Sequence, residues 1–239
     1  MPLTNIKVSN FKSFEELEVN LNRFNILIGA NAAGKSNFIQ IFDFIRQIAK
    51  SNLNNAISMQ GGTEYLQNIN IGSSKDLSIK FTIDEKMHQA VRSKNKERLG
   101  YIEVFETTYE FSLKFKKGGL GYQVAQDKLN QKFYYFNRNN KEHDNLNKVP
   151  GEINIIRGSQ KPFIELLPKN LAFTIEDILP FSFIIEQKLP KNSLLLESPL
   201  FWLGMFELNS FISSFSIYNF DPKLAKHAAM ITGTAELEE

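Results

Sequence analysis

Hydrophobic and polar residues alternate along the N-terminal and central parts of the chain. Residues 6–11 and 17–21 each alternate, with the polar pair Lys12-Ser13 between them. A period of two is typical of a strand with one buried face, so the two runs predict a β-hairpin. The same alternation predicts antiparallel strands with one solvated face within residues 77–83, 101–117 and 131–137.

Two other patterns follow the hairpin. Residues 24–28 (Phe-Asn-Ile-Leu-Ile) are almost continuously apolar and end at Gly29, which predicts a strand buried on both faces. Residues 38–48 repeat apolar side chains at helical spacing around most of the circumference, which predicts a mostly buried helix. The charged stretch from Asp84 to Gly100 predicts a solvated connection or a short helix, and Gly118-Gly119 predicts a hairpin turn.

The C-terminal third is expected to be mainly helical. Between Ser193 and Phe220 the only charged residues are Glu197 and Glu207, and seven are aromatic. A membrane span is the first alternative, but Pro199 and several polar residues interrupt the roughly 20 apolar residues that a span needs. A packed core helix or a partner-facing surface is the better interpretation, and we expect no membrane association.

Composition narrows the class of protein. The chain has 239 residues, no cysteine, 42% hydrophobic residues, and 28 basic against 26 acidic side chains. These values indicate a globular chain with a sizeable core, and they exclude a disulfide scaffold, a cysteine nucleophile and thiolate metal sites. The N-terminus lacks the apolar core of a signal peptide, so we expect a cytoplasmic protein.

A candidate phosphate-binding motif lies between the apolar run at 24–28 and the predicted helix at 38–48. Eight residues there fit the phosphate-binding pattern GxxxxGK[ST], known as Walker A, and the predicted strand and helix supply its structural context. They are Gly29, Ala30, Asn31, Ala32, Ala33, Gly34, Lys35 and Ser36.

Each residue type in this loop has a physical role. Gly29 and Gly34 permit backbone conformations that turn successive N–H groups toward phosphate oxygens. Lys35 would neutralise charge on the β- and γ-phosphates, and the Ser36 hydroxyl is a hard oxygen ligand for Mg²⁺. The sequence therefore predicts that the chain binds ATP with Mg²⁺.

The same region resembles a family. Residues 6–14 (IKVSNFKSF), followed by a strand and by residues 29–37 (GANAAGKSN), are similar to the opening of ABC-type ATPase heads of the SMC, RecF and OLD-like group. The resemblance implies an α/β P-loop NTPase fold, namely an ABC-ATPase-like first lobe with a flanking antiparallel sheet and a helical C-terminal section. Residues 1–180 would form the ATP-binding lobe, with the sheet inserted at about 76–158. Residues 181–239 would lead toward a missing second lobe.

The resemblance also implies roles for further residues. Lys12, and with it Ser13, would lie near the nucleotide, although Lys12 is equally interpretable as a solvated turn lysine. Asn37 would contact the phosphates or cap the helix. Gln60 or Gln67 would reach Mg²⁺ and the attacking water, with an ordinary surface glutamine as the alternative for either.

Two family motifs are absent from these residues: the LSGGQ-like signature and the apolar strand that ends in Asp-Glu. Glu85, in Phe81-Thr82-Ile83-Asp84-Glu85, is the weak candidate for a catalytic carboxylate. The run before it alternates polar and apolar residues, which argues for a half-exposed strand instead of a central one.

Several functional hypotheses follow. The first is an ATPase segment in which ATP acts as a dimerisation switch in DNA repair or anti-phage defence, paired with a second copy or a complementing lobe. The second is a non-catalytic nucleotide-sensing or protein-interaction module. A P-loop kinase or GTPase is disfavoured because no NKxD-like motif is present. Basic and aromatic residues at 114–117 and 132–138 could bind DNA, but intermixed acids favour a solvated strand face.

Overall fold

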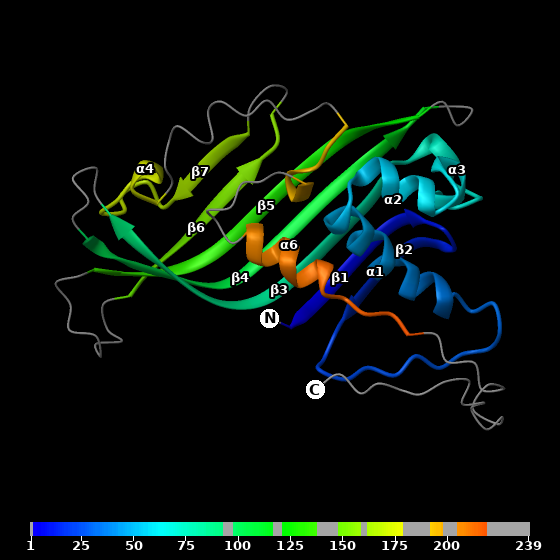
Figure 1. The fold of residues 1–239 in the computed structure, drawn as a ribbon, viewed down its shortest axis with the longest axis horizontal. Coiled ribbons are helices and arrows are strands. Elements are labelled where there is room, and N and C mark those ends of the chain that lie inside the picture. Colours follow the sequence, from blue (N-terminus) through cyan, green and yellow to red (C-terminus); the bar gives the residue numbers. More distant parts are fainter. Residues whose placement is uncertain are drawn as a thin grey trace, which may run out of the picture.

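The structure is a computed structural model that describes residues 2–92, 98–116, 121–137, 148–158, 162–178, 192–197 and 205–218. In these residues one sheet of seven strands runs in the order β2-β1-β3-β4-β5-β6-β7, and every neighbouring pair is antiparallel (Figure 1). The strands are β1 (Leu3–Phe11), β2 (Phe14–Asn20), β3 (Leu77–Arg92), β4 (Arg98–Phe115), β5 (Tyr122–Asn137), β6 (Val149–Ile156) and β7 (Phe163–Leu167). The mixed α/β fold with a large antiparallel sheet is confirmed.

The predicted N-terminal hairpin is confirmed. Ile6 and Val8 point into the core, with 0% and 1% of their surface exposed. Lys12 turns the chain with a φ of 50°, and Phe11 pairs with Phe14 across the turn. The hairpin joins the sheet through β3, so the antiparallel strands expected at about 76–158 are continuous with it.

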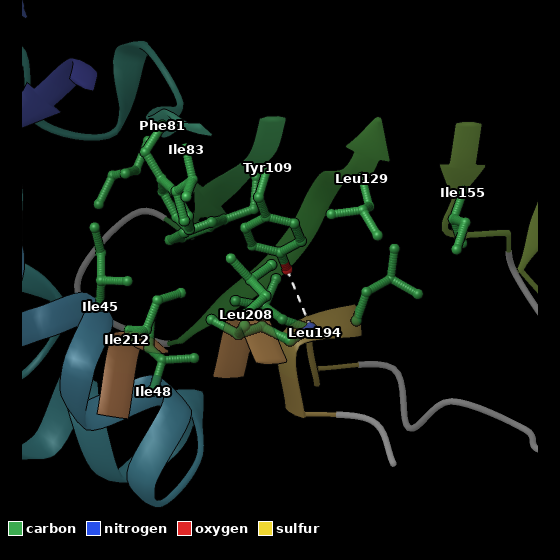
Figure 2. Close-up of a cluster of buried hydrophobic side chains, with 14 of the residues drawn as sticks. Ile45, Ile48, Phe81, Ile83, Tyr109, Leu129, Ile155, Leu194, Leu208 and Ile212 are labelled. Atoms are coloured by element: carbon green, nitrogen blue, oxygen red, sulfur yellow. Dashed lines mark hydrogen bonds between the residues drawn. The ribbon is translucent and has the colours of Figure 1, made fainter. Parts of the chain in front are cut away.

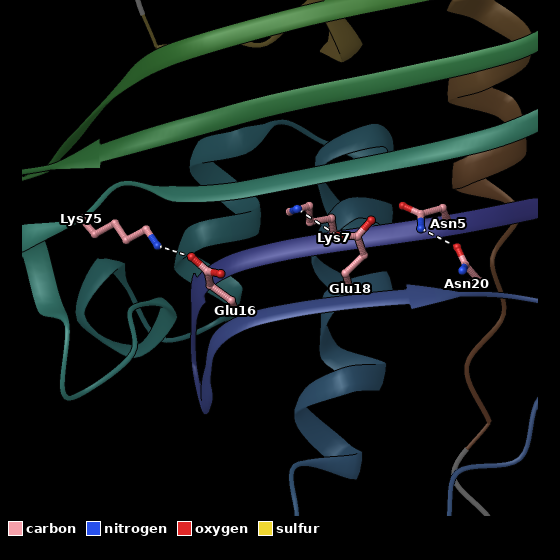
Figure 3. Close-up of polar contacts among 6 residues, drawn as sticks. All are labelled: Asn5, Lys7, Glu16, Glu18, Asn20 and Lys75. Carbon is pink, nitrogen blue, oxygen red and sulfur yellow. Dashed lines mark hydrogen bonds and ion pairs between the residues drawn. The ribbon is translucent and has the colours of Figure 1, made fainter.

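The outer face of the sheet is polar over β2, β1 and the adjoining part of β3. Around the hairpin, Lys7 forms an ion pair with Glu18 at 2.9 Å, and Lys75 forms one with Glu16 at 2.6 Å (Figure 3). Further along, the hydroxyls of Thr82 and Thr108 are 3.0 Å apart. Paired polar side chains keep this face solvated, which is the physical reason for the alternation in the sequence.

The solvated connection or short helix expected from Asp84 to Gly100 is wrong for most of that stretch. β3 continues to Arg92 and β4 begins at Arg98. Val91 is fully buried on the inner face, while His88 on the outer face bonds to Glu103 at 3.1 Å. Charged residues can occupy a strand when they project into water and pair across it, so charge density alone misled the prediction. Gly118-Gly119 lies outside the described residues.

Helices cover the inner face of the sheet. Figure 1 shows α1, α2, α3 and α6 grouped on that side, with α4 at the far end of β3. The predicted helix over 38–48 is confirmed within α1, although Ile39 remains 40% exposed. The described helices are α1 (Lys35–Lys50), α2 (Leu53–Met59), α3 (Thr63–Leu66), α4 (Ile175–Ile178) and α6 (Met205–Ser213), with short 3₁₀ turns η1 (Gly72–Ser74) and η4 (Leu195–Glu197).

The core lies between these layers. Figure 2 shows Ile45 and Ile48 of α1 and Leu208 and Ile212 of α6 pointing toward Phe81 and its strand neighbours. Each of the four helical side chains is at most 2% exposed. Close packing of branched and aromatic side chains holds α1 at a fixed place on the sheet.

The C-terminal part is described only in pieces. α6 is helical as expected, and Phe215, just after it, packs edge-to-face on Phe42 of α1 with ring centroids 6.3 Å apart. This part of the aromatic stretch is therefore core-forming. No helix in the described residues is long and apolar enough to span a membrane. Most of the segment expected to be helical, 181–239, lies outside the described residues, and the division into residues 1–180 and 181–239 stays a prediction.

The prediction that residues 24–28 form a buried strand is wrong for this chain. The segment has no regular secondary structure and is not part of the sheet, and Phe24, Ile26 and Ile28 are 78%, 69% and 91% exposed. An apolar strand is buried only if neighbours cover it. None of the described elements takes that position.

A buried carboxylate anchors η4 to the sheet. Asp127 of β5 accepts hydrogen bonds from the Tyr109 hydroxyl and from the main-chain N–H of Leu195, both at 2.7 Å. Only 1% of Asp127 is exposed, and this burial raises its pKa to about 7, although the bonds from Leu195 and Tyr109 oppose the rise. The carboxyl group that holds η4 on the sheet therefore titrates near neutral pH.

We predict that this carboxylate makes stability depend on pH. The folded pKa of Asp127 lies above its unfolded value of about 3.9, so the folded state binds the proton more tightly and stability falls as pH rises between these values. Relative to Asp127→Asn, the wild-type chain should lose about 2 kcal/mol of unfolding free energy between pH 5 and pH 7 and level off about one pH unit above the folded pKa. Urea unfolding of both proteins at each pH measures this, and parallel pH curves would contradict it.

Candidate functional site

The loop Gly29–Ser36, here called the phosphate loop, curls back and enters α1. Ala32 and Gly34 adopt positive φ values of 64° and 90°, and the Ala33 N–H donates to the Ala30 carbonyl at 3.3 Å. The Phe38 N–H then bonds to the Gly34 carbonyl at 2.9 Å, which starts the helix. Two left-handed residues in such a short span turn the main chain sharply, as a loop that presents its N–H groups to an anion must do.

Lys35 lies across the phosphate loop. Its ammonium donates to the carbonyls of Gly29 and Ala30, at 2.7 Å each. These contacts bring the one cation of the loop to the loop's own first residues. The role of Lys35 in neutralising the β- and γ-phosphates stays a prediction.

The N-terminus of α1 is suited to an anion. Its N-cap, Gly34, offers no side-chain hydrogen bond, and the first turn carries no acidic residue. The first N–H groups of a helix lack partners within the helix and carry positive partial charge. Ser36, in that turn, is exposed. The donor set and the hydroxyl therefore fit a phosphate group with a divalent cation.

The hairpin turn supports the other side of the phosphate loop. The Asn37 side-chain amide donates to the Ser13 hydroxyl at 2.8 Å, so Asn37 ties α1 to the turn instead of capping the helix. A Cβ added at Gly34 would lie 3.2 Å from the Ser13 hydroxyl and 3.3 Å from the ring of Phe14. The turn and the loop are therefore in close contact, although the bond between Asn37 and Ser13 has no signal in the sequence.

Lys12 lies in the same turn. Its N–H donates to the carbonyl of Leu66 at 2.8 Å, and its ammonium lies 5.9 Å from the centre of the Phe11 ring. Partial burial lowers the pKa of Lys12, while the charge of Asp43 on α1 opposes that shift. A cation that has already lost part of its hydration binds a further anion at lower cost. A nucleotide contact by Lys12 stays a prediction.

The two glutamine candidates lie at the C-terminal ends of α2 and α3. Gln60 donates to the Asp43 carboxylate at 3.4 Å, and Asp43 follows Ser36 by two helical turns, or about 10 Å of helix. Gln67 donates to the carbonyl of Thr63 at 3.1 Å. The structure brings neither side chain to Ser36, and a magnesium role for Gln60 or Gln67 remains a prediction.

The weak catalytic candidate lies on an antiparallel strand. Asp84, beside Glu85 on β3, pairs with Glu106 of β4 and is exposed. The side chain of Glu85 lies outside what the structure describes. The half-exposed strand that the alternation predicts is present. The Asp84-Glu85 pair therefore lies on an antiparallel strand and not on the central parallel strand that the catalytic motif requires.

The fold and the phosphate loop together define the class: this is a P-loop ATPase domain. The chain belongs to the AAA ATPase domain family, whose model matches residues 1–216. The chain is also similar to Endonuclease GajA from Bacillus cereus (strain VD045), with 26% identity over 160 residues. That match covers 65% of this chain but 25% of GajA, so the chain spans only a minor part of that relative's length.

We predict that Gly34→Ala damages the site while Gly62→Ala does not. Both glycines have positive φ, which costs other residues about 1–2 kcal/mol. Only Gly34 also faces Ser13 and Phe14, because nothing lies within 4 Å of a Cβ at Gly62. Both variants should lose stability in urea unfolding, but only Gly34→Ala should lose binding of a fluorescent ATP analogue. Equal loss of nucleotide binding in both variants would contradict the contact.

Proposed function

We propose that this chain is the ATP- and Mg²⁺-binding segment of an SMC/RecF/OLD-like ATPase. The observation that supports it best is the phosphate loop, which curls around Lys35 and leads directly into the uncapped N-terminus of α1. The main-chain N–H groups would hold the phosphates, Lys35 would neutralise the terminal ones, and Ser36 would bind Mg²⁺. Ser13 and Asn37 would keep the loop in place.

In this proposal the chain does not supply all the residues that ATP hydrolysis needs. ATP hydrolysis in this group needs a signature motif and an acidic apolar strand, and neither occurs among the 239 residues. Bound ATP would then serve as a dimerisation switch, with a second copy or a complementing lobe supplying the missing groups. We place this switch in the cytoplasm, in DNA repair or anti-phage defence.

DNA is a further candidate partner. The similarity to a protein named as an endonuclease supports DNA as the substrate of the complete assembly. Of the residues proposed for DNA from the sequence, Phe133 and Tyr135 are buried, whereas Lys132 is exposed and paired with Glu106 at 2.7 Å. This part of the sheet therefore offers little free positive charge to a phosphate backbone.

The second candidate function is a non-catalytic nucleotide-sensing or protein-interaction module. The exposed apolar residues 24–28 favour it, since a surface of this kind is typical of an interface. ATP titration separates a pure interaction module from an ATPase segment, because only the latter must bind nucleotide.

We predict that Lys35→Ala weakens ATP binding about 100-fold. Removing a cation from a phosphate costs about 3 kcal/mol, which corresponds to that factor. Isothermal titration with Mg-ATP measures the change. Lys114→Ala, at an exposed lysine on the outer face of β4, is the matched control and should bind like the wild type. Wild-type affinity in Lys35→Ala would contradict the proposal.

We further predict that the purified chain binds ATP but hydrolyses it negligibly. The signature and the acidic apolar strand, which supply the groups that activate water in this class of ATPase, do not occur in the sequence. Phosphate release measured for the wild type, Glu85→Gln and Lys35→Ala should be equally close to background. Robust turnover that disappears in Glu85→Gln would instead assign the catalytic carboxylate to β3.

A further inference from the structure

The sheet ends in two strands that each have a neighbouring strand on one side only. Within the described residues, β2 and β7 lie at opposite edges of the sheet, and no strand lies beside the outward side of either (Figure 1). Main-chain N–H and C=O groups on such an edge are a template for a further strand. Proteins commonly prevent this pairing by placing charged side chains on the edge strand.

The two edge strands differ in charge. Three of the seven residues of β2 are acidic, namely Glu15, Glu16 and Glu18. β7 has the sequence Phe-Ile-Glu-Leu-Leu, and Glu165 is its one charged residue. β2 therefore carries the protection that is typical of an edge strand, whereas β7 presents a largely apolar edge.

The inner face of β7 is only partly covered. Ile164 and Leu166 lie opposite Ile155 and Ile153 of β6, so all four side chains share the inner face of the sheet. Ile153 and Ile155 are 1% and 2% exposed, because β6 has a strand on both sides. Ile164 and Leu166 pack against the same core but remain half-buried. A further strand with apolar side chains on its inner face would bury both residues more completely.

The outer face of β7 favours a cation. Glu165 lies there, diagonal to Glu152 of β6, which is opposite Leu167. Glu152 accepts hydrogen bonds from the side-chain amides of Asn130 and Asn154, and neither carboxylate forms an ion pair with a described residue. Opposite charges on directly paired residues of neighbouring strands are stabilising, and like charges are destabilising. The residue that pairs with Glu165 on a further strand should therefore be lysine or arginine.

Prolines limit the length of this edge. Pro162 and Pro168 flank β7 directly, and proline has no N–H to donate to a neighbouring strand. The edge therefore offers the five residues of β7 for pairing. This length suits a short extended segment better than a long strand.

A second copy of this chain fits the edge poorly. Two antiparallel copies of β7 with Ile164 opposite Leu166 would place Glu165 opposite Glu165, which is unfavourable. A register shift that keeps the apolar faces together brings Pro162 or Pro168 into the paired region. The occupant that matches the edge is instead a segment with a basic residue between apolar ones.

We propose that the free edge of β7 binds a short extended segment of a partner protein, with lysine or arginine opposite Glu165 and apolar residues opposite Ile164 and Leu166. The segment extends the sheet beyond β7 and covers the half-buried side chains of its inner face. This surface is separate from the phosphate loop, which contacts the turn between β1 and β2 at the opposite edge of the sheet.

A symmetric peptide provides the first test. The probe is fluorescein-labelled Thr-Tyr-Val-Lys-Val-Tyr-Thr, in which the lysine faces Glu165, and the comparison peptide has glutamate in place of the lysine. In fluorescence anisotropy the wild-type chain should bind the lysine peptide about fivefold more tightly than the glutamate peptide. Glu165→Lys should reverse this preference. Glu15→Lys, at an exposed glutamate on β2, is the matched control and should keep it.

The reversal also reports on folding, because Glu165→Lys must bind the glutamate peptide to show it. The proposal would be overturned if the wild type bound neither peptide or bound both equally. An unchanged preference in Glu165→Lys, or a reversed one in Glu15→Lys, would overturn it as well.

Hydrogen exchange provides the second test. In the chain alone, the amides of β7 that point away from β6 should exchange at least about tenfold faster than those of Ile153 and Ile155, and the lysine peptide should slow them. Slow exchange before the peptide is added would show that the edge is already covered and would overturn the proposal. Slowing that grows with protein concentration would identify a second copy as the occupant. Lys35→Ala should behave like the wild type in both tests, whatever its affinity for ATP.

Discussion

The packing of α1 against the inner face of the sheet is the contact on which the site depends. Ile41, Phe44 and Ile48 of α1 are completely buried, so the helix cannot rotate or slide without exposing several large side chains. Phe44 also meets Phe11, with ring centroids 6.0 Å apart, at the point where β1 enters the turn of Lys12 and Ser13. The same core contact therefore places the helix N-terminus and the hairpin turn beside each other.

The other end of α1 is fixed by polar contacts. The side-chain amide of Asn209 on α6 donates to the carbonyl of Ala49 at 3.2 Å and to that of Leu196 at 3.0 Å. Leu195, next to Leu196 in η4, is held in turn by the Asp127 carboxylate on β5. The bond to Ala49 satisfies one of the carbonyls that a helix leaves without partners at its C-terminal end. The helix is thus attached to the sheet at its C-terminal end as well as along its buried face.

Much of this arrangement could be predicted from the sequence, because alternation and helical spacing report directly on which side of an element is buried. Such patterns predict the hairpin, the strands β3, β4 and β5, and α1. The glycines and Lys35 predict the phosphate loop. Two features could not be predicted. The pairing of Ser13 with Asn37 joins single residues 24 positions apart and leaves no periodic signal. The exposure of residues 24–28 depends on neighbours that no property of those five residues reveals.

The phosphate loop is held unequally at its two ends. Its last residues are fixed by α1 and by Ser13, whereas its first residue, Gly29, follows a segment that no described element holds. In a loop of this kind the N–H groups must converge on one anion, so freedom at either end weakens all of them together. Any partner that orders Phe24–Ile28 also fixes Gly29, and by linkage an anion that orders the loop favours that partner. Nucleotide binding and ordering of residues 24–28 are therefore expected to be coupled through the peptide bond between Ile28 and Gly29.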